Sequence, residues 1–243
     1  MVAFEYPLNE KNRSYLRFEF LFAQLKMSIS FEHVNDSTIF FKALLELLEL
    51  AERSDIRHEL VKDLRLLSEQ MKNWLNHDGV DHKKETDLIS EIEGLIQDVL
   101  RLSKKLRFFK DNRFLTSLKQ RFFIPGGTCN FDLPQFHFWL ASDLEKRQND
   151  AQSWFSHFAS LEKALTFFLT IKRSQAINTK QIAKNGFYQA EVEKCGFIVV
   201  KVDKNQAVYP VISGHKQRYS IRFMSAESEK NTSDSIEFQQ ICC

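Results

Sequence analysis

The sequence contains few of the residues that interrupt regular structure: only 7 glycines and 4 prolines among 243 residues. This scarcity argues against an all-β sandwich, which needs a turn after every short strand. No apolar run approaches the ~20 residues that a membrane-spanning helix requires. The N-terminus also lacks a basic segment followed by an apolar one. We therefore expect neither membrane insertion nor a signal peptide.

Cysteine is also scarce, with four residues at positions 129, 195, 242 and 243. There is no CxxC pair and no dense spacing of the kind found in disulfide-rich proteins, so free thiols are expected. His77, Asp78, Asp81 and His82 lie close in sequence, but a polar turn between helices explains them without a metal. The sequence therefore predicts no metal site and no cofactor.

Large apolar residues are abundant, with 23 phenylalanines and a hydrophobic fraction of 43%. They recur at steps of three and four, which is typical of amphipathic helices. The helices predicted in this way run from Asn9 as N-cap to Met27, from Ser37 through Leu48, from Ser54 or Asp55 through Trp74, from Leu88 through Leu102, from a loop after Leu106 into a helix ending at Arg121, from Asp132 as cap into Pro134, and from Trp154 to Lys172.

After Ala176 the apolar period changes from 3.6 to 2, which favours strands. The predicted strands are 2–8, 197–202, 207–212, 216–224 and 236–241. The fold class is therefore α+β, with a helical bundle domain and a smaller, mostly C-terminal antiparallel β-strand domain. The predicted helical domain comprises 9–121 and 132–175, and the β-strand domain comprises 1–8, 122–131 and 176–243.

The net charge is only +2, but its distribution along the chain is uneven. Residues 36–100 contain 15 acidic and 8 basic residues, whereas residues 101–123 contain 8 basic residues and a single acidic one, Asp111. Arg13 and Arg17 share one face of the first helix, since they lie four residues apart. The charge difference between the neighbouring segments 36–100 and 101–123 indicates either a binding face or electrostatic attraction between parts of the molecule.

The clearest alternation lies in the predicted strand 216–224. Lys216, Arg218 and Arg222 fall on one face with Ser220, and the apolar residues Tyr219, Ile221 and Phe223 fall on the other with Gln217. A plain solvated face would have the same pattern. With the basic segment and Arg17, however, these cations could form one anion-binding surface.

Two other functions have to be weighed, a thiol enzyme and a nucleic-acid-binding module. Cys129 follows Gly126-Gly127, and His137 lies nearby, so a thiol nucleophile with a base is conceivable. A helix stop followed by a turn explains the same residues, and we favour a protein that is not an enzyme.

A nucleic-acid-binding module is the alternative use of the basic surface. The nearly neutral net charge and the lack of a basic recognition helix count against it.

Several distinctive stretches resemble the ZapD family, the Z-ring-associated division proteins of Gram-negative bacteria. They are Pro7-Leu-Asn-Glu10, Arg13-x-x-Leu-Arg-x-Glu-Phe-Leu21, Ile124-Pro-Gly-Gly-x-Cys-x-Phe-Asp-Leu-Pro134 with His137, Trp139 and Leu140, Asn185-Gly-Phe-Tyr-Gln189, Ile212-Ser-Gly-His-Lys-x-Arg218, Ile221-Arg-Phe-Met224 and Cys242-Cys243. The helices from about 36 to 105 match mainly in pattern.

The resemblance implies a cytoplasmic homodimer at the mid-cell division site. It implies binding to the C-terminal tail of FtsZ and cross-linking of FtsZ filaments into bundles that stabilise the Z-ring. The family's tail-binding surface is basic, and its residues match six positions of this sequence: Arg17, Arg113, His137, Lys216, Arg218 and Arg222. From the charge balance we expect no nucleic-acid partner.

Overall fold

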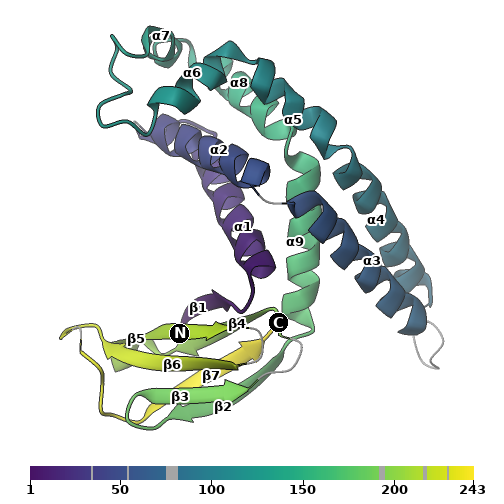
Figure 1. Cartoon of the computed structure of the whole chain (residues 1–243), viewed down its shortest axis with the longest axis vertical. Helices are drawn as coiled ribbons and strands as arrows, with labels where there is room; N and C mark the ends of the chain where they lie inside the picture. Colours follow the sequence, from purple (N-terminus) through teal and green to yellow (C-terminus); the bar gives the residue numbers. More distant parts are fainter. Residues whose placement is uncertain (34, 54, 75–81, 192–194, 216–217, 229) are drawn as a thin grey trace. The chain divides into compact units, whose positions relative to one another are not determined.

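The computed structural model describes the chain except for residues 34, 54, 75–81, 192–194, 216–217 and 229 (Figure 1). Its contacts divide the chain into two compact units. Residues 1–16 and 169–243 form what we call the β unit, and residues 17–168 form the helical unit. The predicted α+β class is therefore confirmed. Among the described residues, no helix has both the length and the apolar character needed to span a membrane.

The helices follow the predicted apolar periodicity in most places. They are α1 (Glu10–Ser28), α2 (Asp36–Arg53), α3 (Ile56–Trp74), α4 (His82–Leu100), α5 (Leu102–Asp111), α6 (Arg113–Arg121), α7 (Pro134–Leu140), α8 (Leu144–Ser156) and α9 (Ala159–Ser174). Asn9 caps α1 as predicted, because its Oδ1 accepts a hydrogen bond from the backbone N–H of Asn12 at 2.8 Å.

Aromatic side chains fill much of the helical core. Phe41 of α2 lies edge-on to Trp139 of α7, with ring centroids 5.0 Å apart, and Trp154 of α8 packs 5.5 Å from the same Phe41. Phe114 of α6 stacks on Trp154 at 5.6 Å. Rings at these separations add to the free energy gained by burial alone, so the aromatic cluster fixes α2, α6, α7 and α8 against one another.

The basic segment differs from its prediction, because it is helical from its beginning rather than looped. In α5 the buried residues Leu102 and Phe109 lie seven positions apart, on one face of the helix. Asn112 then ends α5 and caps α6, and its Oδ1 accepts from the backbone N–H of Leu115 at 3.1 Å. A capping side chain between two short helices thus replaces the expected loop.

The predicted last helix, Trp154–Lys172, is also two helices. Helix α8 begins ten residues earlier, at Leu144, and a turn at 157–158 separates it from α9. In that turn the backbone N–H of Phe158 donates to Phe155 O at 2.9 Å.

Residues 122–131, which the sequence analysis placed with the β-strand domain, lie instead in the helical unit. They form successive turns after α6, beginning with the N–H of Ile124 donating to Arg121 O at 3.0 Å. Gly127 is required here, since an added Cβ would lie 2.2 Å from that same carbonyl oxygen. Asp132 does not cap α7, because its carboxylate accepts from the Arg121 guanidinium at 2.9 Å.

The β unit contains two antiparallel sheets (Figure 1). The first has the order β1–β4–β7–β2, and the second has the order β3–β6–β5. Their strands are β1 (Val2–Pro7), β2 (Ile177–Ala183), β3 (Phe187–Glu191), β4 (Phe197–Val202), β5 (Val208–His215), β6 (Arg218–Ser225) and β7 (Ile236–Cys242). Side chains from both sheets form one buried core, including Val200, Ile221, Phe223 and Phe238.

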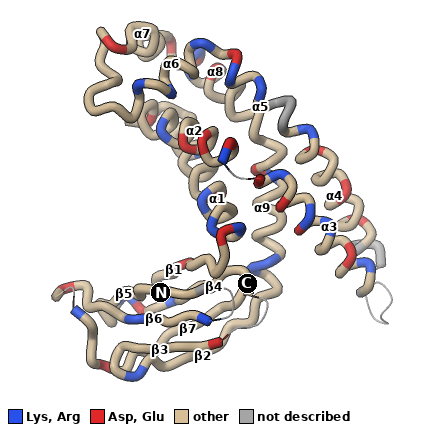
Figure 2. The backbone as a smooth tube through the Cα atoms, viewed as in Figure 1, with Lys and Arg blue, Asp and Glu red and all other residues tan. Residues whose placement is uncertain are grey.

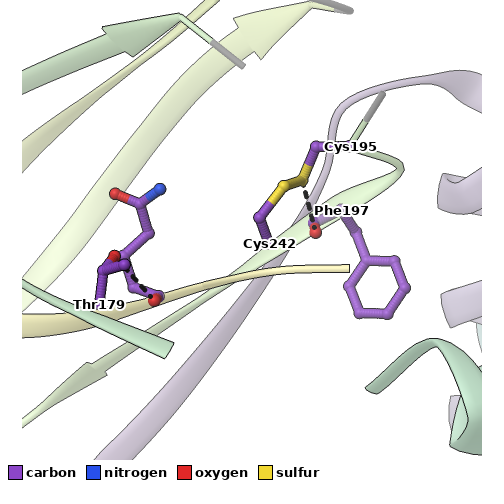
Figure 3. Close-up of a disulfide and its surroundings, with 5 residues drawn as sticks. Thr179, Cys195, Phe197 and Cys242 are labelled. Atoms are coloured by element: carbon purple, nitrogen blue, oxygen red, sulfur yellow. Dashed lines mark hydrogen bonds between the residues drawn. A yellow bond between two sulfur atoms is a disulfide. The ribbon is translucent and has the colours of Figure 1, made fainter. Parts of the chain in front are cut away.

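The cysteines differ from the expectation of free thiols. Cys195 and Cys242 form a disulfide (Figure 3), while Cys129 and Cys243 are free. The pairing of β4 with β7 causes this, because it places Cys242 opposite Ile198, near the start of β4, and Cys195 just precedes that strand. The disulfide therefore joins residues 47 positions apart, at the edge of the shared core.

Candidate functional site

Strand β6 separates its charged and apolar residues as the alternation predicts. Tyr219, Ile221 and Phe223 are almost fully buried, whereas Arg218 and Arg222 are exposed on the outer face of the β3–β6–β5 sheet. Arg218 and Arg222 are four residues apart along the strand, so their Cα atoms are about 13–14 Å apart. Neither forms an ion pair with a described residue.

Neighbouring strands add apolar surface beside Arg222. Phe187 of β3 and Val211 of β5 lie directly opposite it on the two sides. Both are unusually exposed for their type, at 42% and 49%. The Arg222 guanidinium lies 5.9 Å from the centre of the Phe187 ring, within cation–π range. The outer sheet face therefore combines free positive charge with apolar contact area.

Arg17 lies on the exposed side of α1 and lines a cleft of about 370 Å³ between α1 and α2. Phe20, which is 61% exposed, lines the same cleft. Arg53 at the end of α2 also lines it, but its guanidinium pairs with Glu49 one turn earlier. Arg17 is therefore the cation of this cleft that has no ion-pair partner among the described residues.

Arg113 is the first residue of α6 and is exposed. The first turn of α6 contains no acidic residue. The guanidinium thus lies at the positive end of the helix dipole, where a cation is unfavourable and an anion is stabilising. A bound carboxylate would relieve this, so the start of α6 favours an anionic partner.

His137 is exposed on α7, between the buried residues Phe136 and Trp139 and beside Phe138, which is 77% exposed. The indole N–H of Trp139 donates to Asp150 of α8 at 2.9 Å and fixes the orientation of the helix. Phe114, which follows Arg113, packs 6.2 Å from the Trp139 ring. Arg113 and His137 therefore belong to neighbouring helices of the helical unit.

The structure describes five of the six predicted residues, and they are divided between the two units. Arg218 and Arg222 share one face of the β unit, and Arg17, Arg113 and His137 are exposed in the helical unit. Lys216 lies outside the described residues. The polar turn at 77–82 also falls almost wholly outside them.

Cys129 makes a contact that suits a turn. Its thiol donates to Asp132 Oδ2 at 3.4 Å, and its backbone N–H donates to Gly126 O at 3.1 Å. The same Asp132 accepts from Arg121. These contacts explain Cys129 as part of the connection between α6 and α7.

Comparison with known proteins gives a consistent result. The family model for ZapD, described as "Cell division protein", matches residues 16–222. The chain belongs to the ZapD family of cell division proteins. A protein of Aliivibrio salmonicida named "Cell division protein ZapD" is 40% identical over 243 residues, which cover the whole of this chain and 98% of that relative. A protein of the same name from Shewanella baltica is 41% identical over 246 residues, with the same coverage.

Within this ZapD family member, sequence reasoning missed the apolar residues beside the cations. Phe187 and Val211 flank Arg222 only because of the strand register. Phe20 lies beside Arg17 on α1, three residues later, but the cleft that they share forms only where α1 packs on α2. The sequence did contain a signal for Val211, since this residue is apolar although the alternation of its strand assigns its position to the solvent face.

Proposed function

We propose that the protein binds the C-terminal tail of FtsZ and, as a homodimer, cross-links FtsZ filaments into bundles at the mid-cell division site in the cytoplasm. The observation that carries the proposal is the outer face of β6. There Arg218 and Arg222 point away from the core without ion-pair partners among the described residues, next to exposed Phe187 and Val211. An acidic, partly apolar peptide complements such a face.

Arg17, Arg113 and His137 of the helical unit, together with Lys216, are the further residues that we propose to contact the tail. Arginine offers planar, forked donors that match carboxylates. Membership of the ZapD family supports the choice of a division protein as partner.

Single-site binding should be modest and sensitive to salt, because an exposed ion pair contributes only ~0–1 kcal/mol and is screened by salt. Bundling then depends on two copies of the site. A dimer bound to one filament presents its second site at high effective concentration to a neighbouring filament, and two-fold symmetry supplies that second site.

Co-sedimentation tests this proposal. The full-length protein is mixed with polymerised FtsZ and with FtsZ lacking its C-terminal tail, and the pellets of low-speed spins are compared. We expect bundles and bound protein with intact FtsZ only. Equal pelleting of both forms, or a monomer in sedimentation equilibrium at micromolar concentration, would contradict the proposal. Binding to random duplex DNA with similar affinity would favour the nucleic-acid alternative.

A further inference from the structure

A second cleft lies on the opposite side of α2 from Arg17. It has a volume of about 760 Å³ and is enclosed by α2, α5 and α6, all within the helical unit. Ligand sites in proteins typically occupy ~300–1,000 Å³. The side chains of Leu48, Phe109 and Leu115, one from each helix, form its buried apolar floor. The cleft can therefore hold an apolar side chain of several carbons.

The rim of this cleft is basic. Arg107 and Lys110 of α5 and Lys119 of α6 line it, and Glu52 of α2 is the acidic residue of the described lining. Lys119 pairs with Glu52 across the cleft at 2.6 Å. Arg107 and Lys110 are exposed and form no ion pair with a described residue. Figure 2 shows blue basic positions along α5 and α6. Because Glu52 neutralises Lys119, the positive charges of Arg107 and Lys110 remain at the rim.

The end of α2 separates the two clefts. Glu49 and Arg53 line the Arg17 cleft on one side, and Leu48 and Glu52 line the α2–α5–α6 cleft on the other. An extended peptide that crosses the last two turns of α2 can therefore reach both. Charge complementarity selects an acidic peptide, and the apolar floor selects one that carries a hydrophobic side chain.

We infer that the α2–α5–α6 cleft is a second anchor for the acidic tail, in which an apolar side chain lies on Leu48, Phe109 and Leu115 while a neighbouring carboxylate binds Arg107 or Lys110. This inference rests on the proposed function and adds the residues that would bind the apolar part of the tail. A carboxylate of the tail can also compete with Glu52 for Lys119, so binding can open the ion pair that crosses the cleft.

Filling the cleft tests the inference. A labelled FtsZ tail peptide is titrated into the full-length native protein, into Thr116→Trp and into Ala51→Trp, which introduce a large side chain from α6 and from α2. We expect affinity to fall about tenfold to a hundredfold, the contribution of one buried aliphatic side chain. Ser117→Trp is the matched control, because Ser117 is exposed and does not line the cleft. It should bind as the native protein does.

The charged rim is tested by the double variant Arg107→Glu/Lys110→Glu, which should also weaken binding and reduce its salt dependence.

The outcomes separate the inference from the proposed function. If the native protein binds the tail and folded Thr116→Trp and Ala51→Trp bind it equally well, the inference is wrong and the proposed function stands. If the native protein does not bind the tail, both are wrong. If the Trp variants become monomeric but still bind the peptide with native affinity, a second copy of the chain occupies the cleft, and the inference is overturned. Circular dichroism checks the fold of each variant.

Discussion

Cations are displayed differently in the two units. On β6 of the β unit, Arg218 and Arg222 alternate with core residues, so the same local pattern that buries Tyr219 exposes the arginines. In the helical unit many cations pair with acids on other helices or turns, as Lys26 does with Glu162 and Lys119 with Glu52. A sheet face thus shows its charge directly, whereas the free charge of a helical bundle depends on which helices meet.

This difference can be tested first on the core side of β6. Tyr219→Asp puts a carboxylate into a site where the native side chain is 1% exposed. We expect a loss of roughly 4 kcal/mol or more in the free energy of unfolding, because packing is lost and a charge is buried. That is a large part of the stability of an ordinary domain. Urea unfolding followed by circular dichroism measures the change.

Ser220→Asp is the control, since the neighbouring residue lies on the outer face. It should change stability by about 1 kcal/mol or less. Similar losses in the two variants would show that β6 does not separate a core face from a solvent face.

The disulfide provides a second test of the β unit. Reduction should lower the free energy of unfolding by roughly 3 kcal/mol, because the Cys195–Cys242 bond constrains a long loop of the unfolded chain. Denaturant unfolding with and without dithiothreitol measures this. The variant Cys195→Ser should be insensitive to the reductant. Cys129→Ser, which alters the helical unit, should retain the full response and retain bundling activity. An identical midpoint for the native protein with and without reductant would contradict the account.

The sequence predicted the features that depend on local spacing. The strand period located the charged face of β6, and the helical period located α1 and most of α9, although it joined α9 to the end of α8. It missed the beginning of α8, because the buried residues Ala151, Trp154 and Phe155 all lie in its C-terminal half. A polar N-terminal half gives no apolar period, although the ion pair between Lys146 and Asp150 supports it as helix.

Features that depend on contacts between distant segments could not be predicted. The disulfide requires the β4–β7 register, and Phe187 reaches Arg222 only through the β3–β6 register. The cleft between α2, α5 and α6 combines residues more than 50 positions apart. No spacing rule within one segment gives such pairings, since register and helix packing are set by the whole core.

A smaller effect is expected in the helical unit at Gly94. This glycine lies inside α4 with a helical backbone, and an added Cβ would meet no atom within 4 Å. Gly94→Ala should therefore stabilise the protein by about 0.5–1 kcal/mol, through helix propensity alone. Gly127→Ala is the contrasting variant and should destabilise it, because its Cβ would collide with Arg121 O. Thermal unfolding compares the two, and a loss of stability in Gly94→Ala would count against the described packing of α4.

The smallest effect concerns Cys243. Burial, together with the charge of Glu5, raises the pKa of its thiol from 9.0 to about 11. At pH 8 the thiolate is then about 100-fold scarcer than for an unshifted thiol, so alkylation should be slow. Between about pH 9 and 11 the unfolded chain releases this proton while the folded one retains it. Stability should therefore fall as the pH rises through that window.

Iodoacetamide labelling of Cys129→Ser isolates Cys243 as the free thiol. The folded Cys129→Ser variant should react much more slowly than the same variant in urea. Equal rates would indicate that the end of β7 is open to solvent.

The central claim is that the outer face of β6 binds an acidic tail, and a peptide titration tests it most directly. Labelled FtsZ tail peptide is titrated into the native protein, into Arg218→Glu/Arg222→Glu and into Lys180→Glu/Lys204→Glu. The last variant makes the same change in net charge elsewhere in the β unit, at exposed positions of β2 and of the turn after β4. Replacing two attractions by two repulsions should cost roughly 2–4 kcal/mol, or about 30- to 1,000-fold in affinity.

We predict that the β6 variant keeps a native circular dichroism spectrum but loses detectable binding, while the control variant keeps most of its binding. Added salt should weaken binding by the native protein. Unchanged binding by the folded β6 variant would show that its arginines form only a solvated face and would contradict the claim.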